Sequence, residues 1–411
     1  MSSRFDIVIV GAGIAGAALA TVLARAGKSV LLLERSTVYR DRVRGEAIVP
    51  WGVAEAHRLQ LRDVLERAGG AYMTRFVGYD ETHEPSVAES KATPLDTLVD
   101  GAPGVMGISH PAACAALAEA AAAAGATVVY GLSDLAIGAG PSASVRYTSA
   151  GTRHDVTCRL IVGADGRDST VRQQAGISLF GLRPRLAGAG LLVEDLRAWP
   201  TEQMSAGTEG DLIFYVIPQG SGRVRLYLFS TTDQRYRFAG PRGAQAFLEA
   251  FHFKCIPQSD RIVAAHPAGP CAVYPMRDTW TSFTVIDGIA LIGDAAGYSD
   301  PQIGQGLAVA LRDARVLGEL LLAQNDWNPG ALAPYVKERR ERMRRLRACA
   351  DFMFRLRAGF GPIGRERRRE AARRMFGDPE LGLWRSAIYA GPETVPGLAF
   401  DSTIGDRLFA A

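Results

Sequence analysis

Three glycines near the start of the chain have the spacing of a phosphate-binding loop. The sequence Gly11-Ala-Gly13-Ile-Ala-Gly16 follows one apolar run and precedes a second, which ends at Glu34. Glycines at a helix start let the backbone approach a pyrophosphate, where free N–H groups and the helix dipole favour negative charge. A carboxylate about 20 residues further on accepts ribose hydroxyls and repels a 2′-phosphate. The pattern therefore predicts a dinucleotide with an unphosphorylated adenosine, as in FAD or NAD.

Two later segments each place an aspartate at the end of an apolar run. The first is Asp165-Gly166, and the second is Gly293-Asp294. Folds of the α/β class bind ligands at the carboxyl ends of their strands. A carboxylate at such a position can accept hydrogen bonds from ligand hydroxyls. These two segments therefore indicate further ligand contacts at the same edge of the sheet.

A loop containing Pro301, Gly304, Gln305 and Gly306 follows the second aspartate and opens an apolar helix expected over residues 307–322. The N-terminus of a helix carries partial positive charge. The loop is therefore suited to an anionic group on the ligand.

The elements that must position these residues alternate between strands and helices, as in an α/β domain. The expected strands are residues 5–10, 30–33, 127–130 and 160–163. The expected helices are residues 53–66, residues 110–124 with Ser109 as cap, a short helix capped by Ser169, and residues 307–322. Gly138-Ala-Gly140 and Gly188-Ala-Gly190 lack a third glycine and are interpreted as turns or strand ends. Any nicotinamide cofactor must therefore bind without a second Rossmann unit.

Residues 191–285 have a different pattern, which is rich in β-forming residues. Runs at 212–217 and 224–229 are separated by turn formers. In the second run Arg223, Arg225 and Tyr227 share one face. We interpret that face as solvated, with contact to a substrate as the alternative. The residues considered for substrate contact are Tyr215, Arg223 and Tyr227, followed by Trp51, Tyr72 and His266.

Taken together, the three motifs resemble the fingerprints of the single-component (group A) FAD-dependent monooxygenases, the para-hydroxybenzoate hydroxylase-like superfamily. The similarity follows the motif order over residues 4–325. It implies FAD as cofactor and NADH or NADPH as electron donor. It also implies that O2 forms a C4a-hydroperoxyflavin, which hydroxylates or epoxidises an aromatic or other apolar small molecule.

The resemblance also assigns roles to individual residues. Glu34 would hold the adenosine ribose, Arg44 would contact the FAD phosphates, and Asp165 would lie near the pyrophosphate. Asp294 would bind the ribityl chain. The full set of expected cofactor contacts is Gly11, Gly13, Ala15, Gly16, Glu34, Arg35, Arg44, Asp165, Gly166, Gly293, Asp294, Pro301, Gly304, Gln305 and Gly306. Pro301 and Gly304 are expected beside the reacting isoalloxazine ring, and no side-chain base is identified.

The implied fold class is α/β. It has a Rossmann-like FAD-binding domain of the GR2 or para-hydroxybenzoate hydroxylase type, an inserted β-sheet substrate domain and a C-terminal helical segment. The expected FAD-binding domain comprises residues 1–75, 100–175 and 285–330. The expected substrate domain comprises residues 76–99 and 176–284, and the helical segment comprises residues 331–411.

Other members of the wider superfamily share some of these features. Gly45-Glu46 and the Gly-Asp-Ala-Ala-Gly run that ends at Gly297 look similar to flavin-dependent halogenases and geranylgeranyl-reductase-type flavoenzymes. Halogenases need a lysine downstream of the Gly-Glu segment, and this chain has none between Lys28 and Lys91. Halogenation and prenyl-chain reduction remain alternatives. A non-catalytic FAD-fold binding protein is a third, against which the intact aspartate motifs argue.

Composition places the chain among ordinary soluble proteins, with 411 residues, 47% apolar and 22% charged. Five scattered cysteines suggest neither a metal site nor a disulfide framework and fit a reducing cytoplasm. The uncharged run at residues 7–24 contains the three glycines, which argues against a signal peptide or a membrane span. We expect a small-molecule substrate and no nucleic acid, and the sequence indicates no oligomeric state.

Positive charge is concentrated near the C-terminus. Residues 337–374 contain fifteen Lys and Arg against five Asp and Glu, although the whole chain has a net charge of only +4. Apolar residues recur on one side of this segment, with arginines on the other. We interpret it as a surface helix packed on the flavin domain, with a membrane surface or an acidic partner as the alternative.

Overall fold

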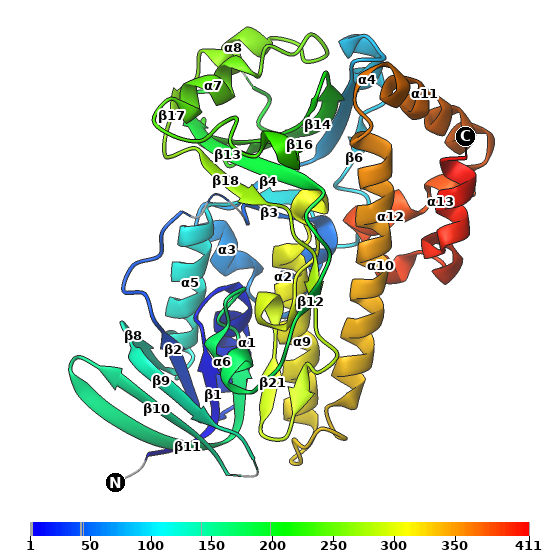
Figure 1. The fold of residues 1–411 in the computed structure, drawn as a ribbon. Helices are drawn as coiled ribbons and strands as arrows, with labels where there is room; N and C mark the ends of the chain where they lie inside the picture. The colour runs from blue at the N-terminus through cyan, green and yellow to red at the C-terminus, as the bar shows by residue number, and fades with distance from the viewer. Residues whose placement is uncertain (1–2, 42, 44, 141, 198, 411) are drawn as a thin grey trace.

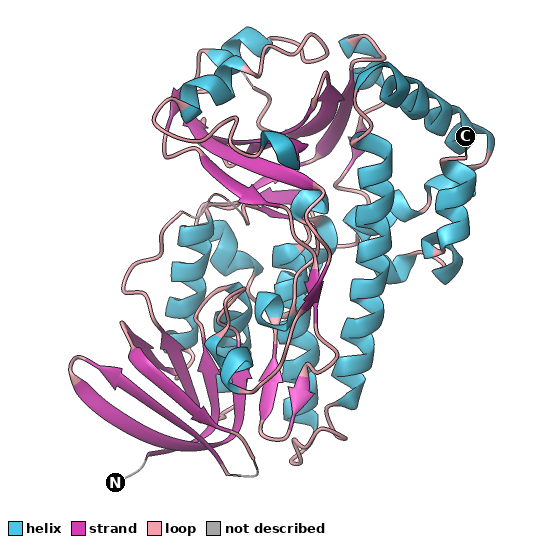
Figure 2. Cartoon of the chain, viewed as in Figure 1, coloured by secondary structure: helices cyan, strands magenta, loops and turns pink. Residues whose placement is uncertain are grey.

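The computed structural model of the chain describes residues 3–41, 43, 45–140, 142–197 and 199–410. Two large β-sheets lie at opposite ends of the molecule, with helices flanking both (Figures 1 and 2). One long helix, α10 (Ala333–Arg357), runs beside the helices of the lower part and reaches the level of the upper sheet (Figure 1). The α/β class, the second sheet and the C-terminal helical segment are therefore confirmed.

The first sheet has eight strands and carries the predicted glycine-rich turn. Its strands are β1 Ser3–Val10, β2 Val30–Glu34, β8 Thr127–Tyr130, β9 Ser133–Gly138, β10 Ala143–Ser149, β11 Thr152–Gly163, β20 Val285–Ile286 and β21 Ile289–Leu291. Strands β21, β11, β1, β2 and β8 lie in that order and run parallel. Ile7, Val8 and Ile9 are all fully buried, as expected for parallel strands that are covered on both faces.

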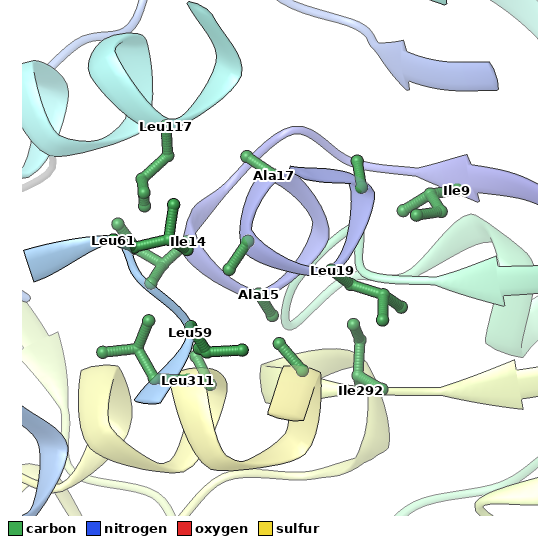
Figure 3. Close-up of a cluster of buried hydrophobic side chains, with 14 of the residues drawn as sticks. Ile9, Ile14, Ala15, Ala17, Leu19, Leu59, Leu61, Leu117, Ile292 and Leu311 are labelled. Carbon is green, nitrogen blue, oxygen red and sulfur yellow. The ribbon is translucent and has the colours of Figure 1, made fainter. Parts of the chain in front are cut away.

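Three helices pack around the glycine-rich turn. They are α1 Ile14–Arg25, α5 His110–Ala123 and α9 Gly306–Ala323. Helix α1 contacts both α5 and α9. Figure 3 shows Ile14 of α1 on the side of Leu117 of α5, and Leu19 of α1 near Ile292; these residues and Leu311 of α9 belong to one core cluster. Because Val10 and Gly163 are paired at the ends of β1 and β11, the N-terminus of α1 lies where both strands end.

The helix expected over residues 53–66 is two helices, so that prediction is wrong. Helix α2 spans Pro50–Arg58 and α3 spans Arg62–Arg67. Gln60 between them has a positive φ of 56°, which no α-helix accommodates. The break turns the chain so that Leu61 becomes fully buried.

The second sheet is mainly antiparallel and also has eight strands. Its strands are β5 Arg75–Asp80, β6 Thr93–Pro94, β13 Leu186–Glu194, β14 Gln203–Glu209, β15 Leu212–Pro218, β16 Val224–Thr231, β17 His266–Pro267 and β18 Ala272–Pro275. Gly188 and Gly190 lie inside β13 rather than at a turn or strand end, which corrects the sequence-based interpretation. A Cβ at Gly188 would come within 2.7 Å of the Tyr274 ring, and one at Gly190 within 2.8 Å of the Tyr227 ring.

Two small sheets and shorter helices complete the fold. The small sheets contain β3 Ala47–Ile48, β7 Val105–Gly107 and β4 Ala71–Met73 in one, and β12 Phe180–Gly181 and β19 Thr279–Trp280 in the other. The remaining α-helices are α4 Pro85–Ser90, α6 Thr170–Gln174, α7 Gly243–Glu249, α8 Ser259–Val263, α11 Gly361–Gly377, α12 Trp384–Ala390 and α13 Ser402–Leu408. The 3-10 helices are η1 Thr232–Gln234, η2 Gly293–Ala296, η3 Pro301–Ile303, η4 Pro379–Gly382, η5 Pro392–Thr394 and η6 Gly397–Phe400.

Within the described residues, no helix has both the length and the apolar character needed to cross a membrane. The division into three domains at the stated boundaries remains a prediction.

Candidate functional site

A cavity of about 1080 Å3 extends from the glycine-rich turn to the second sheet. Most of the expected cofactor contacts line it: Gly11, Gly13, Ala15, Glu34, Arg35, Asp165, Gly166, Gly293, Asp294, Pro301, Gly304, Gln305 and Gly306. Gly16 does not line the cavity. Arg44 lies outside the described residues, so its expected contact with the phosphates has no structural account. Residues from all three motifs, which are far apart in the chain, therefore meet at one cavity.

The glycine-rich turn is built so that the backbone itself faces the cavity. A Cβ at Gly16 would lie 1.9 Å from the Gly11 carbonyl oxygen, so this position closes the turn against the helix. A Cβ at Gly13 would meet nothing within 4 Å, and Gly13 is the N-cap of α1 without a side-chain cap. The first-turn N–H groups of α1 can therefore receive a phosphate.

The carboxylate of Glu34 is held by two backbone amides at the end of β2. Oε2 accepts a hydrogen bond from the Ala12 N–H at 2.9 Å, and Oε1 accepts one from the Ser36 N–H at 2.8 Å. Each oxygen keeps a further lone pair. The side chain is thus oriented along the cavity wall, where it can accept ribose hydroxyls.

Asp165 lines the cavity, and its carboxylate accepts hydrogen bonds from the start of α6. Oδ1 accepts a hydrogen bond from the Ser169 hydroxyl, and Oδ2 accepts from the N–H groups of Thr170 and Val171 at 2.6 and 3.1 Å. These amides belong to the first turn of α6, which Ser169 also caps. The carboxylate therefore stabilises this helix start, and only its position beside the cavity agrees with the expected cofactor role.

Asp294 lies in η2 at the end of β21. Its Oδ2 accepts a hydrogen bond from Arg167 Nε at 3.1 Å, and the Arg167 guanidinium lies over the Tyr298 ring at 4.3 Å. The side chain is about one-third exposed in the cavity. Its other oxygen can therefore accept a ligand hydroxyl.

A buried ion cluster behind η2 holds the Asp294 segment in place. Asp313 of α9 accepts from Arg339 Nε at 2.9 Å and from Arg342 Nη2 at 2.6 Å, and it accepts the Gly293 N–H at 2.8 Å. Burial opposes ionisation of Asp313, but the two guanidinium groups outweigh it and hold the pKa of this carboxyl below its ordinary value. Arg339 also donates to the carbonyls of Gly293, Ala296 and Gly297.

Helix α10 packs on α9 as expected, but this cluster corrects the expected position of two of its arginines. The arginines of α10 were expected on its solvent side, yet Arg339 and Arg342 are 3% exposed. Asp313 and Glu338 compensate these two charges, and Asp313 was not expected because its neighbours in α9 are mostly apolar. Helix α10 therefore supports the third motif directly.

The Pro301 loop forms the middle of the cavity wall. Both polar atoms of the Gln302 side chain are buried, and neither has a hydrogen-bond partner in the described part of the chain. Gln302 lines the cavity, so its amide is available to a ligand. The Gln305 side chain instead accepts from Trp51 Nε1 at 2.9 Å and donates to the Ile303 and Ile388 carbonyls, which makes its role structural.

The far end of the cavity is apolar and aromatic. Tyr215 and Tyr227 line it together with Phe76, Phe229 and Ile388. The Tyr215 hydroxyl donates to the Gln302 carbonyl at 2.8 Å, so the sheet contacts the Pro301 loop directly.

Arg223 is exposed and does not line the cavity. It precedes the first residue of β16 and so lies in the turn that joins β15 to β16. Its position does not support the predicted substrate contact. The three further residues considered for substrate contact do not line the cavity either; they are Trp51, Tyr72 and His266.

A buried acid on the cavity wall was not among the predicted site residues. Glu46, 3% exposed, accepts the Tyr227 hydroxyl and lies 3.4 Å from Arg225 Nε. Burial raises the pKa of Glu46 to about 7, although Arg225 and Tyr227 oppose the shift. Oε1 has no hydrogen-bond partner among the described residues.

The Glu46 cluster also shows that the solvated interpretation of the β16 face is wrong, because Arg225 and Tyr227 are buried. Arg225 donates to Asp41 at 2.5 Å as well. The alternation along the strand indicated the shared face of these residues, but nothing local indicated that Glu46 would cover it.

The geometry fits FAD. The backbone at Gly13 is open where a phosphate would bind, Glu34 is oriented toward the same space, and a Cβ at Gly304 or Gly306 would meet nothing within 4 Å. The buried, unpartnered amide of Gln302 supplies a polar contact further along the cavity. One extended cofactor can therefore contact all three motifs.

Comparison with known proteins agrees with this reading of the cavity. A family model described as an FAD binding domain matches residues 4–350. The chain belongs to this FAD-binding family. The flavoenzyme is 30% identical to a 3-amino-4-hydroxybenzoate 2-monooxygenase of Streptomyces platensis, over 84% of this chain and 86% of that protein. It is 26% identical to a menaquinone reductase of Mycolicibacterium smegmatis, over 78% of this chain and 77% of that protein.

The fold of the flavoenzyme is also similar to that of a solved flavin-dependent halogenase, CmlS. The TM-score is 0.74 with 17% sequence identity, over 88% of this chain and 66% of that one. The resemblance to the para-hydroxybenzoate hydroxylase-like superfamily and the FAD-binding fold are therefore confirmed. The flavoenzyme is an oxidoreductase with FAD as its cofactor, which removes the non-catalytic binding protein from the alternatives.

Replacing Asp294 by Ala is expected to weaken FAD binding about 10-fold to 100-fold, because a ligand hydroxyl loses a charged acceptor. The measurement is the dissociation constant of FAD for the apoprotein, followed by flavin fluorescence. Asp326→Ala, in the exposed loop that follows the C-terminus of α9, is the matched control. Unchanged FAD affinity in Asp294→Ala would contradict the assigned role.

Proposed function

We propose that this flavoenzyme is a monooxygenase that uses NADH or NADPH and O2 to hydroxylate or epoxidise an aromatic or other apolar small molecule. The observation that carries the proposal is the cavity itself. Its nucleotide end is polar and backbone-lined, and its other end is walled by aromatic and aliphatic side chains that contact the Pro301 loop.

Bound FAD would supply the redox and oxygen chemistry. The protein residues bind the cofactor and stabilise its charge. Gly11, Gly13 and Glu34 bind the nucleotide, and Asp294 binds further along. The α9 helix begins at Gly306 without a side-chain cap. Its positive end can therefore stabilise negative charge on the reduced ring system. Pro301 and Gly304, which line the cavity, are the proposed contacts with that ring.

The apolar residues exclude water and orient the substrate. Tyr215 and Tyr227 remain the proposed substrate contacts. Glu46 and Tyr227 form a buried hydrogen-bonded pair on the same wall. With a pKa raised to about 7 by burial, Glu46 can hold a proton near neutral pH and exchange it with a substrate hydroxyl, while the Tyr227 hydroxyl keeps its own proton and donates to Glu46 Oε2.

Halogenation is less well supported by the cavity. The four lysines of the chain are Lys28, Lys91, Lys254 and Lys337. All four lie in the described ranges, and none lines the cavity. The lysine that the halogenase resemblance requires therefore has no counterpart at this site.

Reduction of a carbon–carbon double bond is the second candidate. It is favoured by the similarity to a menaquinone reductase, which extends over most of both chains. The same apolar cavity can accept a prenyl chain. The two proposals differ in what the product gains.

The test uses the purified FAD-loaded protein with a panel of phenolic, indolic, polyketide and prenyl compounds. Stimulated oxidation of NADH or NADPH identifies a substrate, and mass analysis identifies the product. A gain of one oxygen atom is expected. A gain of two hydrogens would instead assign a reductase, and a gain of halogen in the presence of halide would assign a halogenase.

A further inference from the structure

The cationic side chain of Arg357 lies at the apolar end of the cavity, beside Tyr215. Arg357, the last residue of α10, lines the cavity. Its Nη1 donates to the Tyr215 hydroxyl at 3.2 Å, and its guanidinium lies over the Tyr215 ring at 5.6 Å. Tyr215 in turn donates to the Gln302 carbonyl. The charge is therefore held next to the Pro301 loop by two successive hydrogen bonds.

Arg357 differs from other buried or partly buried arginines of α10 in having no acidic partner among the described residues. Arg342 pairs with Asp313, and Arg347 pairs with Asp278 at 3.1 Å. Among the described residues, no carboxylate lies within 4.0 Å of the Arg357 guanidinium. A partly buried charge without a counter-ion is costly, and an anion bound in the cavity would remove that cost.

A second positive charge, that of Arg385, lies near Arg357. Arg385 of α12 has no acidic partner within 4.0 Å in the described residues either. Desolvation and then the charge of Arg357 lower the pKa of Arg385, which means that the two guanidinium groups repel each other. Tyr389 of α12 also lines the cavity and packs against the apolar cluster that contains Phe76 and Phe229. The Arg385 side chain is exposed and does not line the cavity, so solvent screens its charge, whereas Arg357 presents its charge to the apolar surface.

These residues also lie beyond the part of the chain that matches the family model, which ends at residue 350. Arg357, Ile388 and Tyr389 all line the cavity from the C-terminal helices. The C-terminal segment thus supplies a wall of the cavity that the shared FAD-binding part does not contain. Selectivity for a particular substrate can reside there.

We propose that Arg357 is the anion-recognising residue of the substrate pocket and that the substrate carries a carboxylate on an apolar, aromatic body. This inference rests on the proposed function only in taking the apolar end of the cavity as the substrate site. A guanidinium donates two parallel hydrogen bonds to a carboxylate, while Phe76, Phe229 and Ile388 contact the apolar body. Arg357 is a specificity residue, and the chemistry at the flavin does not depend on its proton.

The experiment titrates the oxidised, FAD-loaded enzyme, without NADH or NADPH, with acid and amide pairs. The probes are benzoate, 2-naphthoate and indole-3-carboxylate and their primary carboxamides. Binding is followed by perturbation of the flavin absorbance and by calorimetry. At least one acid is expected to bind more tightly than its amide. Arg357→Met is expected to weaken that acid about 10-fold to 100-fold and to leave the amide unchanged.

Two further variants complete the test. Arg357→Lys keeps the charge but not the paired donors and is expected to retain part of the preference. Arg340→Met, on the exposed side of α10, is expected to bind every probe like the original protein. FAD content and melting temperature establish that each variant is folded.

Three outcomes would overturn the proposal. The first is that no acid binds the original protein more tightly than its amide. The second is that Arg357→Met weakens acid and amide equally. The third is that Arg357→Met raises the KM for NADPH but not for NADH, which would assign Arg357 to binding of the 2′-phosphate of NADPH. An Arg357-dependent preference without oxygen transfer in turnover would contradict the monooxygenase proposal and leave this inference standing.

Discussion

Replacing Arg339 by Met is expected to release FAD and to lower the free energy of unfolding by about 3–5 kcal/mol. The guanidinium is almost fully buried and donates to Asp313 and to three carbonyls around η2. Without it, the Asp313 charge loses one of its two buried partners. The Asp294 segment also loses the donors that shape it. The measurements are urea denaturation followed by circular dichroism and the flavin absorbance of the purified protein.

The matched control is Arg344→Met on the same helix. Arg344 pairs with Glu341 at 2.8 Å, but both side chains are about half exposed. A pair of this kind contributes about 0–1 kcal/mol, so FAD content and stability are expected to change little. The double variant Arg339→Met with Asp313→Leu is expected to recover part of the stability, because it removes the uncompensated charge. Equal behaviour of Arg339→Met and Arg344→Met would show that the buried cluster has no special role.

Replacing Glu46 by Gln is expected to remove a pH dependence of stability between about pH 4.5 and 7. Burial raises the pKa of Glu46 from 4.5 to about 7, so the folded protein holds this proton more tightly than the unfolded chain does. The resulting stabilisation is complete below pH 4.5 and is lost as the pH rises through 7. The loss corresponds to about 3 kcal/mol.

The measurement is the difference in unfolding free energy between the original protein and Glu46→Gln at pH 5, 6, 7 and 8. This difference is expected to change with pH, with the Gln variant relatively more stable at the higher values. Glu119→Gln, on an exposed position of α5, controls for the loss of an acid elsewhere. Tyr227→Phe removes a hydrogen bond that lowers the pKa of Glu46 and is expected to move the transition to higher pH. A difference that is constant from pH 5 to 8 would contradict the buried-acid assignment.

The same variant tests the proposed catalytic role. If Glu46 exchanges a proton with the substrate, kcat should fall by about 10²-fold to 10⁴-fold and lose its inflection near pH 7. Unaltered FAD affinity separates this effect from cofactor loss.

The predicted cofactor residues that line the cavity near its nucleotide end are close neighbours in the chain. Gly11, Gly13 and Glu34 belong to one strand–turn–helix–strand unit, so their spacing in the sequence largely fixes their positions relative to one another. The buried α9 helix was likewise recognisable from its own apolar residues. Asp165 was assigned to the cofactor from the motif alone. Its carboxylate also accepts hydrogen bonds at the start of α6, because the Ser169 and Thr170 donors lie within five residues, and its contact with the cofactor stays a prediction.

The errors in the sheet domain and the C-terminal helix have a shared cause. Arg225 and Arg339 were expected to face solvent because charged side chains usually do. Each is buried against a carboxylate from a distant part of the chain, Asp41 in one case and Asp313 in the other. Arg223, two residues from Arg225, precedes β16 and stays exposed, so the alternating pattern selected the right face but not the right residue.

The FAD site could thus be located from one-dimensional spacing, since helix dipoles, turn glycines and strand ends are local features. The substrate end of the cavity could not. Glu46 meets Tyr227 across 181 positions of the chain, and Arg357 reaches Tyr215 across 142. Such pairs exist only after the second sheet and the C-terminal helices pack on the flavin-binding part. Burial, which then raises the pKa of Glu46 and leaves Arg357 without a counter-ion, is a property of that packing rather than of any sequence pattern.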